Sequence, residues 1–168
     1  FINARIDGRI YRLEAIVTRR KGAEGKLPVA LLLHGKDFLG SVMADVRPSI
    51  NNGPARDMAD RGWLAVSFTR RGFGQSDGPY PALASCESLK LEDQFASDAK
   101  DVAAVMEALR QRPDADMDRV IAIGVSAGGA AAVSLASRNP SGLVAIVNIS
   151  GGLSLTNCVE KGNPELVR

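Results

Sequence analysis

The chain alternates short apolar runs with longer amphipathic segments, and turn residues separate them. Residues 29–33, 120–123 and 143–149 are almost continuously apolar, which is typical of strands buried on both faces of a parallel sheet. A further strand is expected over residues 63–69. The rough alternation over residues 9–20 predicts an antiparallel edge strand.

Three helices are expected between these strands. The longest covers residues 89–110, where apolar residues recur at three- and four-residue steps. Shorter helices are expected over residues 55–60, ending at Gly62, and over the alanine-rich residues 127–137. Alternating strands and helices predict an α/β fold whose mostly parallel, doubly wound sheet carries helices on both faces. In such sheets the site lies beyond the carboxyl ends of the strands.

Composition bounds the class of protein. The 168 residues are 45% hydrophobic and 24% charged, with a net charge of +2, which suits one globular domain. The basic residues are scattered apart from residues 19–21 and 70–71, so we expect no nucleic-acid partner. No apolar run approaches the roughly 18–20 residues that span a bilayer, and no signal peptide is visible.

Cysteine and histidine are sparse. The chain has Cys86, Cys158 and a single histidine, His34, without any metal-ligand spacing, so we expect neither a metal nor a cofactor. The two cysteines are either independent thiols or a disulfide. The disulfide is considered because both cysteines follow predicted strands at one edge of the sheet. A disulfide implies an oxidising compartment. Together with a first residue, Phe1, that is not methionine, this leans toward a periplasmic or secreted protein, with the cytoplasm as the alternative.

Residues 124–128 read Gly-Val-Ser-Ala-Gly, a G-x-S-x-G motif between a predicted strand and a predicted helix. A sharp turn between the two elements holds Ser126 in a strained conformation with its hydroxyl exposed. A side chain at Gly124 or Gly128 would strike the opposite limb of the turn. The amino end of the following helix favours negative charge at this place. The pattern therefore predicts Ser126 as a catalytic nucleophile.

Two other interpretations of this motif are weaker. The glycines alone could serve close packing at a strand-to-helix turn. Gly124, Ser126 and Gly129 are also one substitution away from the dinucleotide-binding G-x-G-x-x-G pattern. The next strand, however, ends at Asn148, where that pattern needs an acidic residue for the ribose.

An oxyanion-binding loop is expected after the strand over residues 29–33. Acyl transfer needs two preplaced N–H donors, and we expect the backbone amides of Lys36 and Ala127. Gly35 lets the backbone come close to the serine. His34 is interpreted as a structural residue that hydrogen-bonds the loop, with a role as general base as the alternative. The Lys36 side chain either steers an anionic substrate or points to solvent.

The segment over residues 70–78 contains three glycines and follows the strand over residues 63–69. We expect Arg71 to pair locally and to hold this loop near the site. Ser76 lacks the strand-turn-helix context of a nucleophile. A turn hydrogen bond with Asp77 is its expected role.

These motifs occur in a fixed order, namely His34-Gly35, then Arg71-Gly72-x-Gly74-x-Ser76-Asp77-Gly78, then Gly124-x-Ser126-x-Gly128-Gly129. In this order they resemble the α/β-hydrolase superfamily, and within it the dienelactone-hydrolase-like and serine esterase-peptidase-like branches. The resemblance runs from about residue 9 to residue 152. It implies a triad in the chain order serine, acid, histidine, with Ser126 as nucleophile.

The chain departs from the family pattern after the serine. No histidine follows Ser126, and Glu160 and Glu165 lie in a polar tail. We therefore expect residues 1–168 to be the amino-terminal and central part of a single α/β-hydrolase domain whose carboxyl-terminal part is missing from this chain. The remainder of the domain, in the full protein or as a second chain, supplies the acid and the histidine. An exposed sheet edge and apolar helix face should result. Loss of the chemistry is the other account.

The resulting functional prediction is a serine hydrolase. It cleaves an ester, lactone, thioester or peptide-like acyl bond of a small molecule, without a metal or cofactor, and the isolated segment is expected to be inactive without its base. A non-catalytic binding protein on the same fold is one alternative, because fold does not determine function. An acyltransferase that uses the same serine is another. Products formed with water and with alcohol acceptors distinguish it from a hydrolase.

Overall fold

The computed structural model describes residues 1–35, 43–79 and 91–152, and it places seven strands in two sheets. A small antiparallel pair is formed by β1 (Ile2–Ile6) and β2 (Arg9–Leu13). The main sheet has the order β3-β5-β4-β6-β7. Its strands are β3 (Ala15–Thr18), β4 (Leu27–Leu33), β5 (Leu64–Phe68), β6 (Ala115–Val125) and β7 (Leu143–Ile149). Only β3 runs antiparallel to its neighbour, which confirms the prediction of a mostly parallel sheet.

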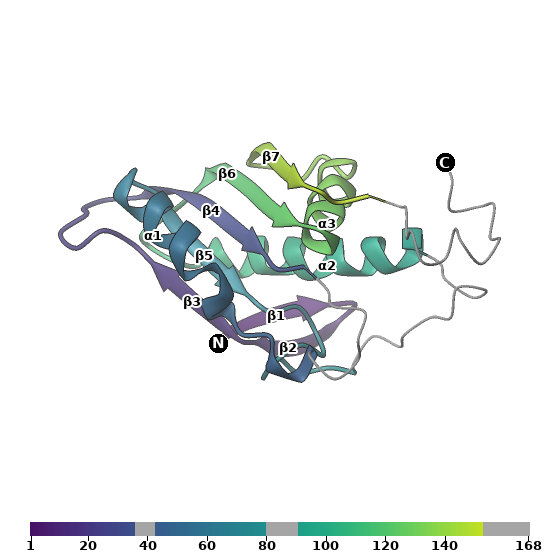
Figure 1. The fold of residues 1–168 in the computed structure, drawn as a ribbon. Coiled ribbons are helices and arrows are strands. Elements are labelled where there is room, and N and C mark those ends of the chain that lie inside the picture. Colours follow the sequence, from purple (N-terminus) through teal and green to yellow (C-terminus); the bar gives the residue numbers. More distant parts are fainter. Residues whose placement is uncertain (36–42, 80–90, 153–168) are drawn as a thin grey trace.

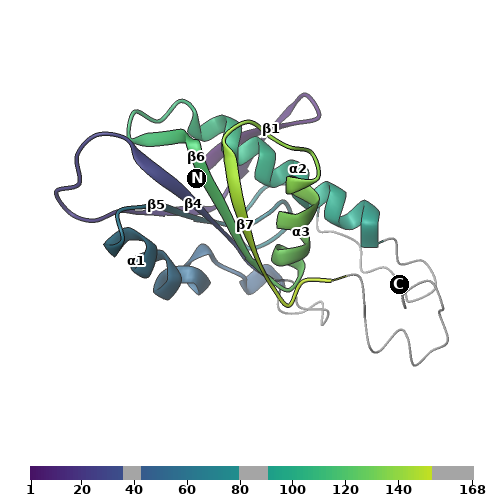
Figure 2. The same cartoon turned by 90° about the horizontal axis from the view of Figure 1, so that it is seen from above.

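Helices lie on both faces of the main sheet, as Figure 1 and Figure 2 show. On one face α1 (Asn52–Asp60) packs against β5, and on the other α3 (Ala127–Ala136) packs against β6 and β7. The longer α2 (Leu91–Leu109) lies along α3 and β1. Two short 3₁₀ turns, η1 (Met43–Asp45) and η2 (Pro48–Asn51), precede α1. The doubly wound arrangement is therefore confirmed.

The central strand β4 supplies both halves of the core. Leu31 and Leu33 point into the large cluster under α2 and α3, and Leu32 points into the small cluster with Ala55 of α1 and Ala65 of β5. All three leucines are buried, because a strand with neighbours on both edges and helices on both faces meets no water. This explains the unbroken apolar run.

Two element boundaries in the structure differ from those that the sequence predicted. The single edge strand expected over residues 9–20 is broken at Glu14, whose backbone N–H donates to Ser76 Oγ and whose carbonyl accepts from the Thr69 amide. Both backbone groups of Glu14 thereby bind the loop after β5, and the two halves join different sheets. Helix α1 begins at Asn52 rather than residue 55, because Pro54 lies in its first turn, where no intrahelical N–H bond is required.

In strand β7 the predicted burial is wrong, and the exposed sheet edge that was also expected is found. The strand was expected to be buried on both faces, but Val147 and Ile149 are 45% and 46% exposed. The reason is tertiary: β7 is an edge strand whose described neighbour is β6. Val147 lies opposite Ile123 and Ile149 opposite the exposed Val125, so these side chains share a face. In the described part of the chain no helix covers this face, since α1 packs on β5 and α3 on the other side.

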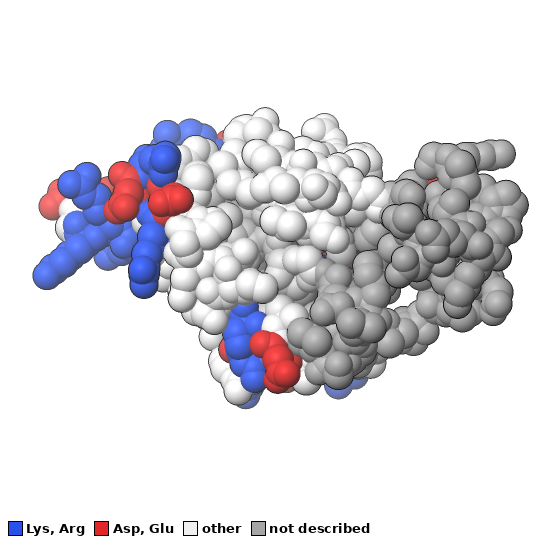
Figure 3. Space-filling view, viewed as in Figure 1, with Lys and Arg blue, Asp and Glu red and all other residues white. Residues whose placement is uncertain are grey.

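On the face shown in Figure 3 most charged residues gather at one end of the molecule, and a smaller group lies at its lower edge. Figure 3 shows Lys, Arg, Asp and Glu together at the end of the molecule that holds the β3–β4 turn, and the middle of this face is mostly uncharged. The charges there include the ion pairs of Asp114 with Arg19 and Arg112, and of Asp116 with Arg119. Across the described ranges, no helix has the length and apolar character needed to cross a membrane.

Candidate active site

Ser126 stands on the turn between β6 and α3, at the carboxyl end of the sheet. Its backbone has φ 52° and ψ −122°, a conformation that residues other than glycine rarely adopt. Such strain costs on the order of 1–3 kcal/mol and is found mainly at functional sites. The side chain is half-buried, and among the described residues its hydroxyl has no hydrogen-bond partner. Within the described part of the chain, the position of this hydroxyl is therefore set by the Ser126 backbone.

The glycines on either side of Ser126 are required by close backbone contacts. A Cβ at Gly124 would overlap the backbone of Gly128 and Gly129 on the opposite limb of the turn. A Cβ at Gly128 would overlap the backbone at the end of β4, 2.6 Å from the His34 carbonyl oxygen. The turn therefore wedges the first residues of α3 against the β4 loop. Gly35, on that loop, faces the Ser126 side chain: a Cβ there would lie 3.5 Å from Ser126 Cβ.

The end of β7 supports the turn from the other side. The Ser126 N–H donates to the Ile149 carbonyl oxygen at 2.8 Å. The Asn148 side chain then closes the turn that follows β7, accepting from the Gly151 N–H at 2.8 Å and donating to the Gly151 carbonyl oxygen at 3.0 Å. Asn148 thus has a structural use at the place where a dinucleotide site would need an acid.

His34 is held at both ring nitrogens. Its Nδ1 lies 2.6 Å from the Gly35 carbonyl oxygen, and its Nε2 accepts the Arg70 backbone N–H at 3.1 Å. This pattern requires the neutral ring with its proton on Nδ1. Burial, and then the nearby Arg70 charge, hold the pKa of His34 well below its ordinary value. The ring is 3% exposed. With both nitrogens occupied by backbone groups, His34 has no free position from which to take a proton from Ser126.

A buried ion pair lies beneath the His34 loop, and the sequence reasoning missed it. Arg70, at the carboxyl end of β5, is 1% exposed, and its Nη1 donates to the His34 carbonyl oxygen at 2.8 Å. Its Nε lies 3.6 Å from Oδ1 of Asp98 on α2. A signal was present, since Asp98 falls three residues after Phe95 and four before Val102, on the apolar face of the helix. Phe73 lies against both the Arg70 guanidinium and the His34 ring.

A second, partly buried ion pair holds the arginine-glycine loop. The Arg71 backbone N–H and Nε donate to the two carboxylate oxygens of Asp101 on α2, at 2.8 and 2.7 Å. Burial raises the pKa of Asp101, while these hydrogen bonds and the Arg71 charge act in the opposite direction. The expectation that Arg71 holds the loop agrees with this contact, but its partner lies on α2 rather than nearby in the chain. Helix and loop are thereby joined one turn away from the Arg70–Asp98 pair.

Ser76 does not make the turn hydrogen bond with Asp77 that was expected. Its hydroxyl donates to the Thr69 carbonyl oxygen at 2.8 Å and accepts the Glu14 N–H at 2.9 Å. Asp77 instead accepts the Arg12 N–H through Oδ2 at 2.9 Å. Both side chains therefore tie the loop to the break between β2 and β3, which sequence spacing does not show.

The other predicted site residues divide into two groups. Ala127 is the first residue of α3, so its amide is among those without an intrahelical acceptor. Lys36, Cys86, Cys158, Glu160 and Glu165 lie outside the described residues, and so does any test of the disulfide. Within the described residues no cluster of histidine, cysteine and acidic side chains could hold a metal.

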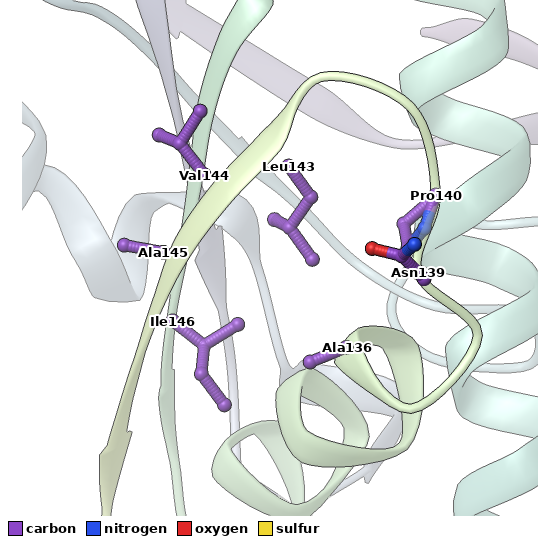
Figure 4. A pocket seen from close by; sticks show the side chains of 7 residues that line it. All are labelled: Ala136, Asn139, Pro140, Leu143, Val144, Ala145 and Ile146. Carbon is purple, nitrogen blue, oxygen red and sulfur yellow. The ribbon is translucent and has the colours of Figure 1, made fainter.

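A hollow of ≈ 250 Å³ lies at the opposite end of β7 from the serine turn, between that strand and the end of α3. Figure 4 shows Leu143 and Ile146 on the side of β7 that faces Ala136. Ser126 binds Ile149 at the other end of the strand. The hollow therefore belongs to the uncovered edge of the sheet and not to the serine.

In sequence, the chain is similar to known hydrolases. The sequence profile of the X-Pro dipeptidyl-peptidases of the S15 family matches residues 7–166. The chain belongs to this family. Membership of this hydrolase family agrees with the resemblance to the α/β-hydrolase superfamily that the sequence motifs indicated. A curated relative, "Putative esterase NocK" from Nocardia uniformis subsp. tsuyamanensis, is 32% identical over 145 residues, which are 86% of this chain and 38% of that protein. This S15-family chain thus spans well under half of the relative's length.

Solved structures share the fold. A structure of Est1E from Butyrivibrio proteoclasticus with bound ferulic acid matches 97% of this chain and 57% of its own, with a TM-score of 0.61 and 15% identity. A dienelactone hydrolase-like promiscuous phosphotriesterase from metagenomic libraries matches 88% of this chain and 62% of its own (TM-score 0.55, 20% identity). Proline iminopeptidase of Mycobacterium smegmatis matches 90% and 44% (TM-score 0.61, 22% identity). At these identities the likeness shows the α/β-hydrolase fold alone, and this chain spans 44–62% of the length of these structures.

Proposed function

We propose that the full-length protein is a serine hydrolase that cleaves an acyl bond with Ser126 as its nucleophile. The strained Ser126 backbone carries this proposal. A positive φ is costly for serine, and the contacts of Gly124, Gly128 and the Ile149 carbonyl maintain it. The result is a half-buried hydroxyl at the amino end of α3, where a developing negative charge is favoured.

In the proposed reaction the Ser126 oxygen adds to the substrate carbonyl carbon, and its proton passes to a histidine. The oxyanion accepts hydrogen bonds from the backbone amides of Ala127 and Lys36. The carbon–leaving-group bond then breaks, and the histidine returns the proton to the leaving group. Water cleaves the acyl-enzyme by the same route. The occupied nitrogens of His34 support a structural role for it, so the catalytic histidine and its acid are assigned to residues outside this chain.

We propose further that residues 1–168 form the amino-terminal and central part of one α/β-hydrolase domain. Two observations support this division. The chain spans 38–62% of the relatives described above. The apolar face formed by Val125, Val147 and Ile149 is exposed at the edge where a continuing sheet and its helix would pack. The remainder of the domain is the expected cover and the source of the base.

The acyl bond is proposed to be an ester or a proline-containing peptide bond. The curated relative is described as an esterase, whereas the family description names X-Pro dipeptidyl-peptidases. Both substrates pass through the same tetrahedral intermediate, so the Ser126 site by itself suits either. Pocket residues contributed by the remainder of the domain would then decide between them.

The test treats the full-length protein with a fluorophosphonate probe and maps the adduct, with the Ser126→Ala variant as control. One adduct on Ser126, absent in the variant, is the expected result. Hydrolysis of a p-nitrophenyl ester is then compared with release of p-nitroaniline from an Xaa-Pro anilide. Loss of the faster activity in Ser126→Ala by at least about 10³-fold is expected, as for removal of a triad nucleophile. A labelled or fully active Ser126→Ala protein would overturn the proposal.

A further inference from the structure

We propose that Arg70 and Asp98 are positioning residues that hold the His34–Gly35 loop in register with Ser126. The proposal rests on the proposed function, and it concerns a buried pair that the reaction scheme above does not use. Neither side chain reaches the serine. Their effect passes through His34, which both the backbone and the side chain of Arg70 contact.

Arg70 grips the loop at two points. Its backbone N–H donates to His34 Nε2, and its Nη1 donates to the His34 carbonyl oxygen. A Cβ on Gly128 would overlap the Leu33 carbonyl oxygen and would lie 2.6 Å from that of His34, so these two carbonyls form the surface against which the serine turn packs. A displacement of the His34 carbonyl would therefore change the separation between β4 and the first turn of α3.

The second half of the relay is the His34 ring. Its Nδ1–H donates to the Gly35 carbonyl oxygen at 2.6 Å. A trans peptide is planar, so a bond that holds a carbonyl also sets the plane of the peptide to which it belongs. The Gly35 carbonyl shares its peptide with the amide of residue 36, the predicted oxyanion donor. Arg70 thus acts on the loop through His34 without touching a substrate.

Asp98 is the partner that aims Arg70. Its Oδ1 accepts from Gln94 Nε2 at 3.0 Å and faces Arg70 Nε at 3.6 Å. Both side chains are at least 94% buried, and within the described residues Arg70 Nε, Arg70 Nη2 and Asp98 Oδ2 have no hydrogen-bond partner. A pair with this geometry does not offset its own desolvation well, and replacing such pairs by apolar side chains is often neutral for stability. The proposed effect of the Arg70–Asp98 pair is therefore on the position of the His34–Gly35 loop and not on stability.

Arg71 and Asp101 provide a matched control on the same loop and helix. In that pair Asp101 is buried and Arg71 partly buried, but the pair makes two direct hydrogen bonds and does not contact His34. A purely structural view treats the two pairs alike. The positioning view separates them, because only the Arg70–Asp98 pair is expected to alter His34 and the reactivity of Ser126.

The experiment compares the full-length wild-type protein with the double variant Arg70→Met/Asp98→Leu, with Arg70→Lys and with Asp101→Asn. Three quantities are measured: the midpoint of thermal unfolding, the rate constant of Ser126 labelling by the fluorophosphonate, and the NMR signal of the His34 Nδ1 proton. That signal is assigned by its loss in His34→Gln. If an ester is hydrolysed, kcat and KM are measured separately.

The double variant is expected to unfold within a few degrees of the wild type and to label about 10- to 100-fold more slowly, because misplaced loop donors reduce reactivity. Its His34 signal should shift or lose protection from solvent exchange. A fall in kcat with little change in KM is expected, since the loop acts in the transition state. Asp101→Asn should lower the unfolding midpoint and leave the His34 signal unchanged.

Arg70→Lys keeps the charge but not the planar fork that faces Asp98 and the His34 carbonyl together. If the double variant does not fold, the same readouts on Arg70→Lys decide. Wild-type labelling rate and an unchanged His34 signal in a folded variant would overturn the positioning proposal and leave the serine hydrolase standing. If the wild type is not labelled but the His34 signal shifts in the variants, the serine hydrolase proposal is overturned and the link between the Arg70–Asp98 pair and His34 is kept.

Discussion

At the scale of single residues, the site depends on groups whose chemistry is set by burial. Ser126 is strained by its backbone, and His34 is kept neutral by two backbone partners and by its distance from water. His34 is the only histidine of the chain. Its perturbed state should therefore be visible in the pH dependence of stability.

We predict that His34 lowers stability in acid. Its folded pKa lies well below the ordinary value of 6.5. Between the two values the unfolded chain binds one proton more than the folded chain, so the free energy of unfolding falls as the pH drops below about 6.5. From pH 7.5 to 5.5 the loss from this group is on the order of 1 kcal/mol. Urea unfolding of the wild type and of His34→Gln at both pH values measures it. Equal pH dependence in the two proteins would contradict the assignment.

At the scale of elements, the ends of β4 and β6 and the start of α3 meet in close backbone contact at the serine turn. The sequence reasoning recognised the turn because its steric requirements are local: the two glycines and the serine lie within five residues. It did not find the Arg70–Asp98 pair: helical periodicity places Asp98 on the apolar face, but it does not indicate a partner 28 positions earlier in the chain. The partner of Ser76 was missed for the same reason.

We predict that Gly128→Ala destabilises the protein by about 2–3 kcal/mol, since the new Cβ meets fixed backbone of the β4 loop rather than a flexible side chain. Labelling of Ser126 should fall together with stability. Gly53→Ala is the matched control. Gly53 lies in α1 with nothing within 4 Å of an added Cβ, so alanine should raise stability by up to about 1 kcal/mol. Chemical denaturation measures both. Similar unfolding free energies for the two variants would mean that the backbone at the serine turn can move to accommodate the added Cβ.

At the scale of the whole molecule, the described chain is well packed around β4 and open at β7. Val125, Val147 and Ile149 expose an apolar face next to the serine turn, and the hollow of Figure 4 lies on the other side of the same edge strand. The relatives extend well beyond the matched region. A protein that completes this sheet would remove both features from water.

We predict that Val147→Asp destabilises the full-length protein by about 2–4 kcal/mol, because a covered carboxylate without a partner is costly. Ile50→Asp is the control, since Ile50 is also an exposed apolar residue, 66% accessible in η2, which contacts β3 and β5 at the other edge of the sheet from β7. It should change stability by no more than about 0.5 kcal/mol. The unfolding free energies of both variants decide. A neutral Val147→Asp would show that the β7 face stays in water.

The sequence by itself determined the alternation of strands and helices, the mostly parallel sheet and the serine turn, because apolar periodicity and glycine sterics act over a few neighbouring residues. Only the tertiary structure decided which charged side chains became buried, which groups occupied the nitrogens of His34, and that the expected exposed sheet edge lies at residues 143–149. An apolar run predicts burial, but the number of its neighbours determines whether burial is reached. Those neighbours come from segments far apart in the chain.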